Sequence, residues 1–167
     1  MATLEQLLLP GEAEFLASSF PQYLKFLGTN FPIAVLAFDA ASTETAFWKV
    51  SAKAYGSGNW TIDYYWYADN ASTGDVLWAV QLAAITPNTD SQDIETKAFA
   101  TQQTVLDTHL GTTGQRLHQC SISLSNLDGV AVGDQCWLKI SRLGADGTDT
   151  MANDALLERV VVTFSDT

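Results

Sequence analysis

The stretch WTIDYYWY, residues 60–67, decides the fold class. Successive side chains of a β-strand point to opposite faces of a sheet. In this stretch one face carries only apolar and aromatic side chains, those of Trp60, Ile62, Tyr64 and Trp66. The opposite face carries Thr61, Asp63, Tyr65 and Tyr67. Alternation of this kind, in residues that favour strands, predicts a β-strand with one face in a core.

Seven further short apolar segments share this character, and Gly, Asn, Asp or Ser residues close most of them. Short strands between regular turn signals, without helix-length patterns between them, are typical of sandwiches and jelly rolls. We therefore predict an all-β fold, an eight-stranded antiparallel β-sandwich or jelly roll with an irregular N-terminal arm. The predicted strands are residues 33–38, 47–54, 60–67, 76–85, 99–106, 117–124, 136–140 and 156–164.

Residues 1–32 differ from the rest, and we predict an N-terminal arm there and a jelly-roll domain over residues 33–167. Prolines at 10, 21 and 32 interrupt the segment. The segment either lies as a strap across its own sandwich or packs on a neighbouring subunit. In the second case its aromatic residues are interface anchors, and a chain lacking residues 1–30 is expected to fold. These candidate interface residues are Phe15, Phe20, Tyr23, Phe26 and Phe31.

Composition limits the partners of the chain. The 167 residues suffice for one domain with a sizeable core. A net charge of −11, with only eight Lys and Arg residues, argues against nucleic-acid and anionic-membrane partners, because both bind basic patches. Apolar residues make up 47% and charged residues 16% of the chain, so we expect neighbouring subunits to cover part of the surface.

The start of the chain lacks the basic region and long apolar run of a signal peptide, and no stretch is long enough for a membrane span. We expect synthesis in a cytoplasm. Cys120 and Cys136 cannot form a disulfide framework, and we predict that they are small buried residues on strands. A bridge between them is the alternative.

Candidate chemical sites are weak, and we predict no catalytic, cofactor or metal residues. His109 and His118 lack metal-ligand spacing, which argues against a zinc site. His118 and Cys120 share a face of one predicted strand, and we expect both to serve packing. The acidic loop 146–154 lacks the oxygen spacing of a calcium loop and reads as a turn. Glycosidase chemistry needs two facing carboxylates, which the sequence neither selects nor excludes.

The second face of strand 60–67 leaves two alternatives open. Tyr65 and Tyr67 either lie against a neighbouring subunit or stack on sugar rings, as aromatic residues do in carbohydrate-binding modules. We favour the subunit interface and include both tyrosines among the candidate interface residues.

Five segments carry a family resemblance: FW at 47–48, YYW at 64–66, TGDVLWAVQ at 73–81, AFATQQTV at 98–105 and DTMANDA at 149–155. From residue 31 onward the chain resembles jelly-roll proteins of tailed-bacteriophage virions. Such proteins are commonly trimeric and occur as capsid cement proteins, head fibres and tail-fibre domains. The resemblance implies a structural role and no catalytic residues.

The leading hypothesis is therefore a capsid cement (decoration) protein. It would be a homotrimer on the outer capsid surface, bound to the major capsid protein and made in the host bacterial cytoplasm. One alternative is a head- or tail-fibre domain that contacts host glycan. Another is a carbohydrate-binding module outside a virion. An enzyme is not expected.

Overall fold

The protein is all-β, as the alternation in its sequence predicts. A computed structural model describes residues 2–70, 73–89, 91, 93–111 and 113–167. The described residues contain ten strands, one 3-10 turn and no α-helix. They therefore include no helix that is long and apolar enough to cross a membrane. The elements are β1 (Thr3–Leu8), η1 (Pro10–Glu12), β2 (Gln22–Phe26), β3 (Ile33–Phe38), β4 (Thr43–Ser51), β5 (Trp60–Ala68), β6 (Thr73–Ile85), β7 (Gln103–Leu110), β8 (His118–Leu124), β9 (Gln135–Leu143) and β10 (Ala155–Ser165).

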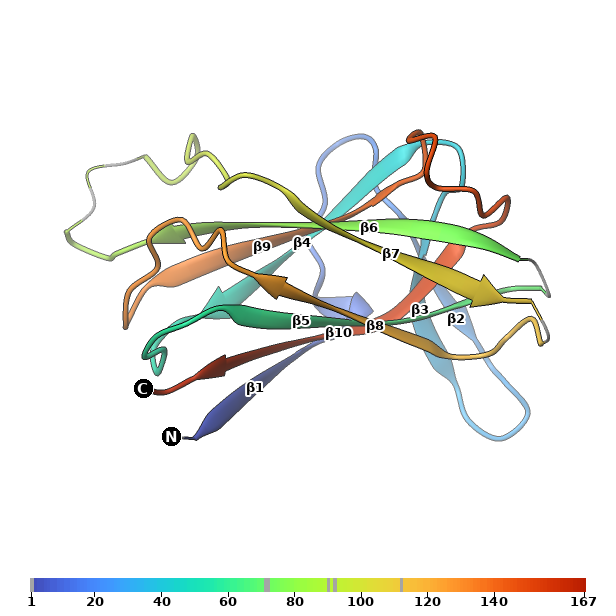
Figure 1. The fold of residues 1–167 in the computed structure, drawn as a ribbon, viewed down its shortest axis with the longest axis horizontal. Coiled ribbons are helices and arrows are strands. Elements are labelled where there is room, and N and C mark those ends of the chain that lie inside the picture. The colour runs from blue at the N-terminus through green and yellow to red at the C-terminus, as the bar shows by residue number, and fades with distance from the viewer. Residues whose placement is uncertain (1, 71–72, 90, 92, 112) are drawn as a thin grey trace.

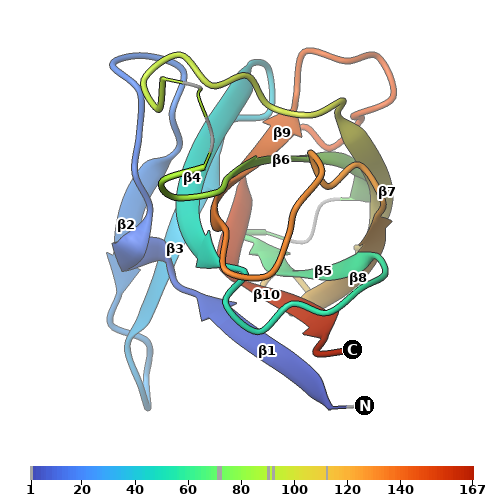
Figure 2. The same cartoon turned by 90° about the vertical axis from the view of Figure 1, so that its left-hand side faces the viewer.

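Two antiparallel sheets lie face to face, which confirms the predicted sandwich (Figure 1). One sheet has the order β2-β3-β10-β5-β8, and β1 pairs with β10 beside that path. The other sheet has the order β4-β9-β6-β7. Figure 2 looks along the strands and shows the β2–β3 hairpin at one side of the sandwich. Two sheets packed in this way enclose one core between their inner faces.

The core is rich in aromatic residues. All four side chains on the apolar face of residues 60–67 are fully buried, as their alternation predicts. Tyr64 stacks on Trp78 of the facing sheet with ring centroids 5.5 Å apart, and Phe38 meets the same indole edge-on at 5.3 Å. Contacts of this geometry add to the stabilisation that comes from area burial alone.

The predicted count of eight strands is wrong, because residues 1–32, predicted to be irregular, supply two of the ten strands among the described residues. β1 pairs with β10 along its whole length, and β2 pairs with β3. Between these strands the chain crosses to the other sheet, where Glu14 bridges Phe47 and Ser19 O accepts a hydrogen bond from Thr45 N at 2.9 Å. The spacing of Leu4, Leu7 and Leu8 is typical of one face of a helix. The residues form a strand instead, because they pair with β10.

A buried ion pair fixes the loop after β9. Arg142 and Asp149 are both fully buried, with Nη2 and Oδ1 2.8 Å apart. The guanidinium also donates to three backbone carbonyl oxygens, those of Phe38, Met151 and Asn153. The prediction that the acidic loop 146–154 is a turn is confirmed, since Asp146 accepts hydrogen bonds from Thr148 N and Oγ1.

Both cysteines are free, and each lies on a strand, Cys120 on β8 and Cys136 on β9. Cys136 is fully buried and Cys120 is half-buried. Burial, together with the carboxylates of Asp134 and Asp128, raises the pKa of the Cys136 thiol to about 12. Burial likewise raises the pKa of the Cys120 thiol, with Asp107 and Asp63 as further causes.

We expect both thiols to resist alkylation in the native protein at pH 8. Because a thiol pKa near 12 replaces the ordinary value of 9, the thiolate fraction of Cys136 falls by roughly a thousandfold. Iodoacetamide labelling followed by mass spectrometry measures the rate at each cysteine. Rapid labelling of Cys136 without denaturant would contradict its burial, and labelling in guanidinium chloride is the control.

Candidate functional site

The candidate site forms where two strands share one edge of β10. β3 pairs with β10 only at Ala155–Leu157, and β1 pairs with the same edge from Val160 to Ser165. The pairing of β10 with β5 shifts register between Leu157 and Arg159, which places a bulge at Glu158. Because a bulge bends a strand and increases its twist, β3 leaves β10 at this point and the β2–β3 hairpin splays away.

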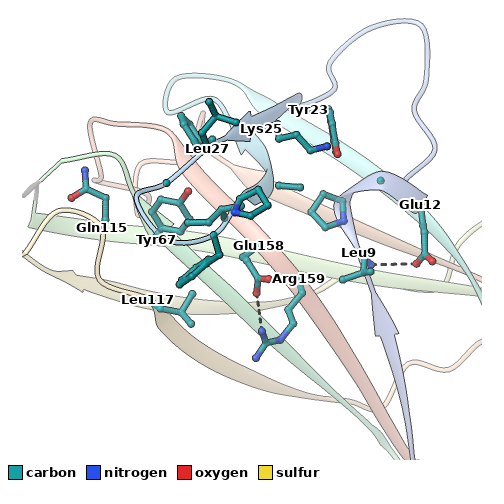
Figure 3. A pocket seen from close by; sticks show the side chains of 18 residues that line it. Leu9, Glu12, Tyr23, Lys25, Leu27, Tyr67, Gln115, Leu117, Glu158 and Arg159 are labelled. Carbon is teal, nitrogen blue, oxygen red and sulfur yellow. Dashed lines mark hydrogen bonds and ion pairs between the residues drawn. The ribbon is translucent and has the colours of Figure 1, made fainter.

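The splayed hairpin leaves a groove of about 1150 Å³, seen from close by in Figure 3. The hairpin forms one wall, and Leu9, directly after β1, forms the other together with η1. β5 and β10 supply the floor, and the segment before β8 closes one end. The side chains used in the following argument are Glu12, Tyr23, Lys25, Phe26, Leu27, Phe31, Tyr67, Gln115, Leu117, Glu158 and Arg159.

A tight turn holds the hairpin wall. Gly28 has a φ of 59°, in the left-handed region. A Cβ atom there would lie 2.3 Å from the carbonyl oxygen of Phe31. Glycine therefore permits the turn that presents two exposed apolar side chains, Leu27 with 82% and Phe31 with 67% of its surface accessible.

The floor of the groove combines charge with aromatic surface. The guanidinium of Arg159 lies over the Tyr65 ring, 4.0 Å from its centroid, and its Nη1 donates to Glu158 at 2.9 Å. The pair and the stacking hold both side chains in place. Burial raises the pKa of Tyr67, with the carboxylates of Asp69 and Glu158 as further causes. The Tyr67 phenol therefore stays protonated at neutral pH and can donate a hydrogen bond.

The groove is built for a ligand that is both apolar and rich in hydrogen-bonding groups. Its surface is mostly apolar, and two carboxylates and two cations are set into it, Glu12, Glu158, Lys25 and Arg159. Ligand sites typically show this combination of apolar walls with a few placed polar groups. Among the described residues, no group of three or more His, Cys, Asp or Glu side chains could hold a metal ion.

The structure brings together four of the seven predicted interface residues. Tyr23, Phe26, Phe31 and Tyr67 all line the groove. Tyr65 lies beside it, under Arg159. Phe15 and Phe20 lie outside the groove, on the segment between η1 and β2, with ring centroids 5.8 Å apart. Their contact with a partner subunit stays a prediction.

Sequence reasoning missed the charged and polar side chains of the groove. A signal for two of them was present: Glu158 and Arg159 interrupt the apolar run LLERVVV at 156–162. A charged pair inside a buried strand points to a bulge or to an outward-facing site. Gln115 and Lys25 carry no comparable signal, because only the folded chain brings them to the groove.

No family model and no curated protein matches the sequence. Several solved structures match the fold. One is described as Xyl-CBM35 in complex with a glucuronic acid-containing disaccharide (17% identity, 93% of this chain and 91% of that chain, TM-score 0.52). Another is a family 35 carbohydrate-binding module from an environmental isolate (13% identity, 94% of this chain and 91% of that chain, TM-score 0.50). A third is the CBM36-1 domain of a multidomain xylanase from the hindgut metagenome of Trinervitermes trinervoides (10% identity, 95% of this chain and 96% of that chain, TM-score 0.47).

These similarities confirm the jelly-roll β-sandwich and correct the predicted function. The hypothesis of a bacteriophage capsid cement protein is wrong, because the two similar structures with TM-scores of 0.52 and 0.50 are carbohydrate-binding modules and neither is a virion protein. The resemblance to phage proteins holds for the jelly-roll fold alone, which many functions share. A homotrimer, a capsid-protein partner and a virion location stay predictions that a single chain does not test.

Proposed function

We propose that the protein is a non-catalytic carbohydrate-binding module and that the groove between the β2–β3 hairpin and β10 is its sugar site. The observation that supports this proposal best is the composition of the groove. Exposed aromatic side chains from the hairpin face a fixed pair of charged side chains on the floor. This corresponds to the alternative that the sequence left open.

The chemistry of a sugar fits these groups. A pyranose ring has apolar C–H faces, which stack on aromatic rings such as those of Tyr23 and Phe31. Its hydroxyl groups both donate and accept hydrogen bonds. Glu158 supplies an acceptor, and Arg159 supplies donors that its ion pair already orients. Binding of this kind needs no nucleophile and no general acid.

Fold similarity adds limited support. The two similar structures with TM-scores of 0.50 and 0.52 are described as family 35 carbohydrate-binding modules, and one of them holds a disaccharide that contains glucuronic acid. Glucuronic acid oligosaccharides are therefore reasonable first probes. The hairpin groove is proposed as the site from the side chains of this chain alone.

The experiment is a glycan array followed by calorimetry with the best-bound glycan. We expect Phe31→Ala to weaken binding by about tenfold, because a stacked aromatic anchor contributes on the order of 1–2 kcal/mol. The fold should not suffer, since 67% of the Phe31 side chain is exposed. Phe15→Ala is the matched control: it makes the same change outside the groove and should leave affinity unchanged.

Two outcomes would contradict the proposal. One is the absence of binding to any glycan on an array that includes neutral and uronic acid oligosaccharides. The other is binding that Phe15→Ala weakens and Phe31→Ala does not, which would place the site on the segment between η1 and β2.

A further inference from the structure

Two buried histidines lie behind one end of the groove. His109 of β7 and His118 of β8 are 1% and 8% exposed, and their ring centroids are 4.6 Å apart. His118 also stacks on Trp66 at 4.9 Å. They are the only histidines in the sequence. A close pair of imidazoles in a core cannot take up a proton without placing a charge beside the second ring.

Hydrogen bonds define the tautomer of the neutral His109 ring. The backbone N–H of Gly111 donates to His109 Nδ1 at 3.1 Å. Nδ1 is therefore an acceptor, so the proton of the neutral ring is on Nε2, which lies 3.1 Å from the carbonyl oxygen of Gly114. Both ring nitrogens of His109 thus hold the chain that follows β7. Within the described residues, Nε2 of His118 is buried and has no partner.

The segment that His109 holds is part of the groove. Gln115 directly follows Gly114, and its side chain lines the groove and donates to Asp69 O at 2.7 Å. Leu117 directly precedes His118 and also lines the groove (Figure 3). The end wall of the sugar site therefore depends on the same backbone that the histidine pair fixes.

The surroundings of His118 favour its neutral form. Burial lowers the pKa of His118 below its ordinary value of 6.5, His109 lowers it further, Asp107 raises it and Arg116 lowers it. Asp107 accepts a hydrogen bond from Trp66 Nε1 at 2.8 Å. Cys120, whose thiol has a raised pKa, stays neutral. In the unfolded chain the histidine takes a proton near pH 6.5, whereas in the folded chain it does so only at lower pH. The folded state therefore loses stability as pH falls from about 6.5.

We propose that the His109–His118 pair is a pH-operated latch on the sugar groove, an inference that rests on the proposed function. A proton on His118 places a positive charge against the His109 ring, 4.6 Å away. The His109 ring is then displaced, and its hydrogen bonds with Gly111 N and Gly114 O are lost. Residues 113–117 then leave their position, the groove loses Gln115 and Leu117, and sugar affinity falls in acid.

The latch can be tested first on the free protein, without any sugar. The 1H–15N spectrum is recorded from pH 7.5 to 5.0, and the side-chain amide of Gln115 and the backbone amide of Leu117 are followed. We expect both signals to shift with one transition below pH 6.5 in the wild type. In His118→Phe, which keeps the stacking on Trp66 but cannot take up a proton, the transition should be lost. His109→Gln, which keeps a donor and an acceptor at this position, is the second variant.

The sugar measurement then tests the consequence for binding. The array glycan bound best at pH 7.5 is titrated by calorimetry at pH 7.5 and 5.0. We expect affinity to fall by at least about fivefold in the wild type, the lower end of usual coupling between sites, and by less than about twofold in His118→Phe.

Separate results overturn the two proposals. Signals of Gln115 and Leu117 that do not move with pH, or that move equally in the wild type and both histidine variants, disprove the latch. A pH-dependent movement of these signals combined with no glycan binding disproves the sugar site and leaves the conformational change standing. Glycan binding with equal affinity at pH 7.5 and 5.0 disproves the latch alone.

Discussion

Replacing Arg142 by methionine is expected to lower the free energy of unfolding by about 3–5 kcal/mol, the usual cost of removing one partner of a buried ion pair. The guanidinium is fully buried, and all five of its N–H groups have acceptors. The Asp149 side chain is also fully buried, and among the described residues only the backbone N–H of Leu77 would still donate to it. The variant would leave an uncompensated carboxylate in the core.

Urea denaturation at pH 7, followed by tryptophan fluorescence, measures this loss. Arg116→Met is the matched control, since Arg116 is exposed and surface changes usually alter stability by less than about 0.5 kcal/mol. The double variant Arg142→Met with Asp149→Leu should recover part of the loss, because both charges are then removed. A single Arg142→Met variant within about 1 kcal/mol of the wild type would show that the ion pair does not stabilise the fold.

The alternation that predicts the core also places Arg142 in it. Cys136, Leu138 and Ile140 are buried alternate residues of β9, and Arg142 is the next residue of that face. Continuing the period of two therefore predicts a buried arginine, which requires a buried carboxylate nearby. Asp149, in the acidic loop seven residues later, meets that requirement. The pair could thus be predicted from sequence, although the three carbonyl acceptors could not.

The groove could not be predicted in the same way. It exists because β3 and β1 share one edge of β10 and part at Glu158, and these pairings join residues more than a hundred positions apart. Periodicity reports which face a side chain occupies and contains no information on which strand lies beside another. The aromatic residues of the hairpin wall were recognised, but as interface anchors, because their position opposite the charged floor depends on this pairing.

The function was misassigned for a related reason. Segments such as TGDVLWAVQ at 73–81, which lies on β6, belong to the strands of the jelly-roll sandwich. A fold of this kind carries many functions. The residues that line the groove at the sheet edge lie outside those segments.

Deleting residues 1–9 is expected to remove most of the stability of the protein, in contrast to the expectation from sequence that a chain lacking residues 1–30 folds. β1 contributes a whole strand to the larger sheet, and Leu8 is only 4% exposed in the common core. Leu9 O accepts a hydrogen bond from Trp48 Nε1 at 2.9 Å, and its loss would leave a buried indole N–H unpaired. Loss of the Leu8 side chain alone costs about 2–5 kcal/mol, a large part of the 5–15 kcal/mol typical of a whole domain.

Thermal denaturation followed by circular dichroism measures the effect, and two neighbouring leucines give a matched comparison within β1. Leu8→Ala should cost about 2–5 kcal/mol because the side chain lies in the core. Leu7→Ala should cost less than about 1 kcal/mol, because Leu7 is 52% exposed on the outer face of the same strand. If the truncated chain unfolds cooperatively at the wild-type temperature, or if both leucine variants are as stable as the wild type, β1 adds nothing to the domain. In that case residues 1–32 are an independent arm, free to pack on a partner.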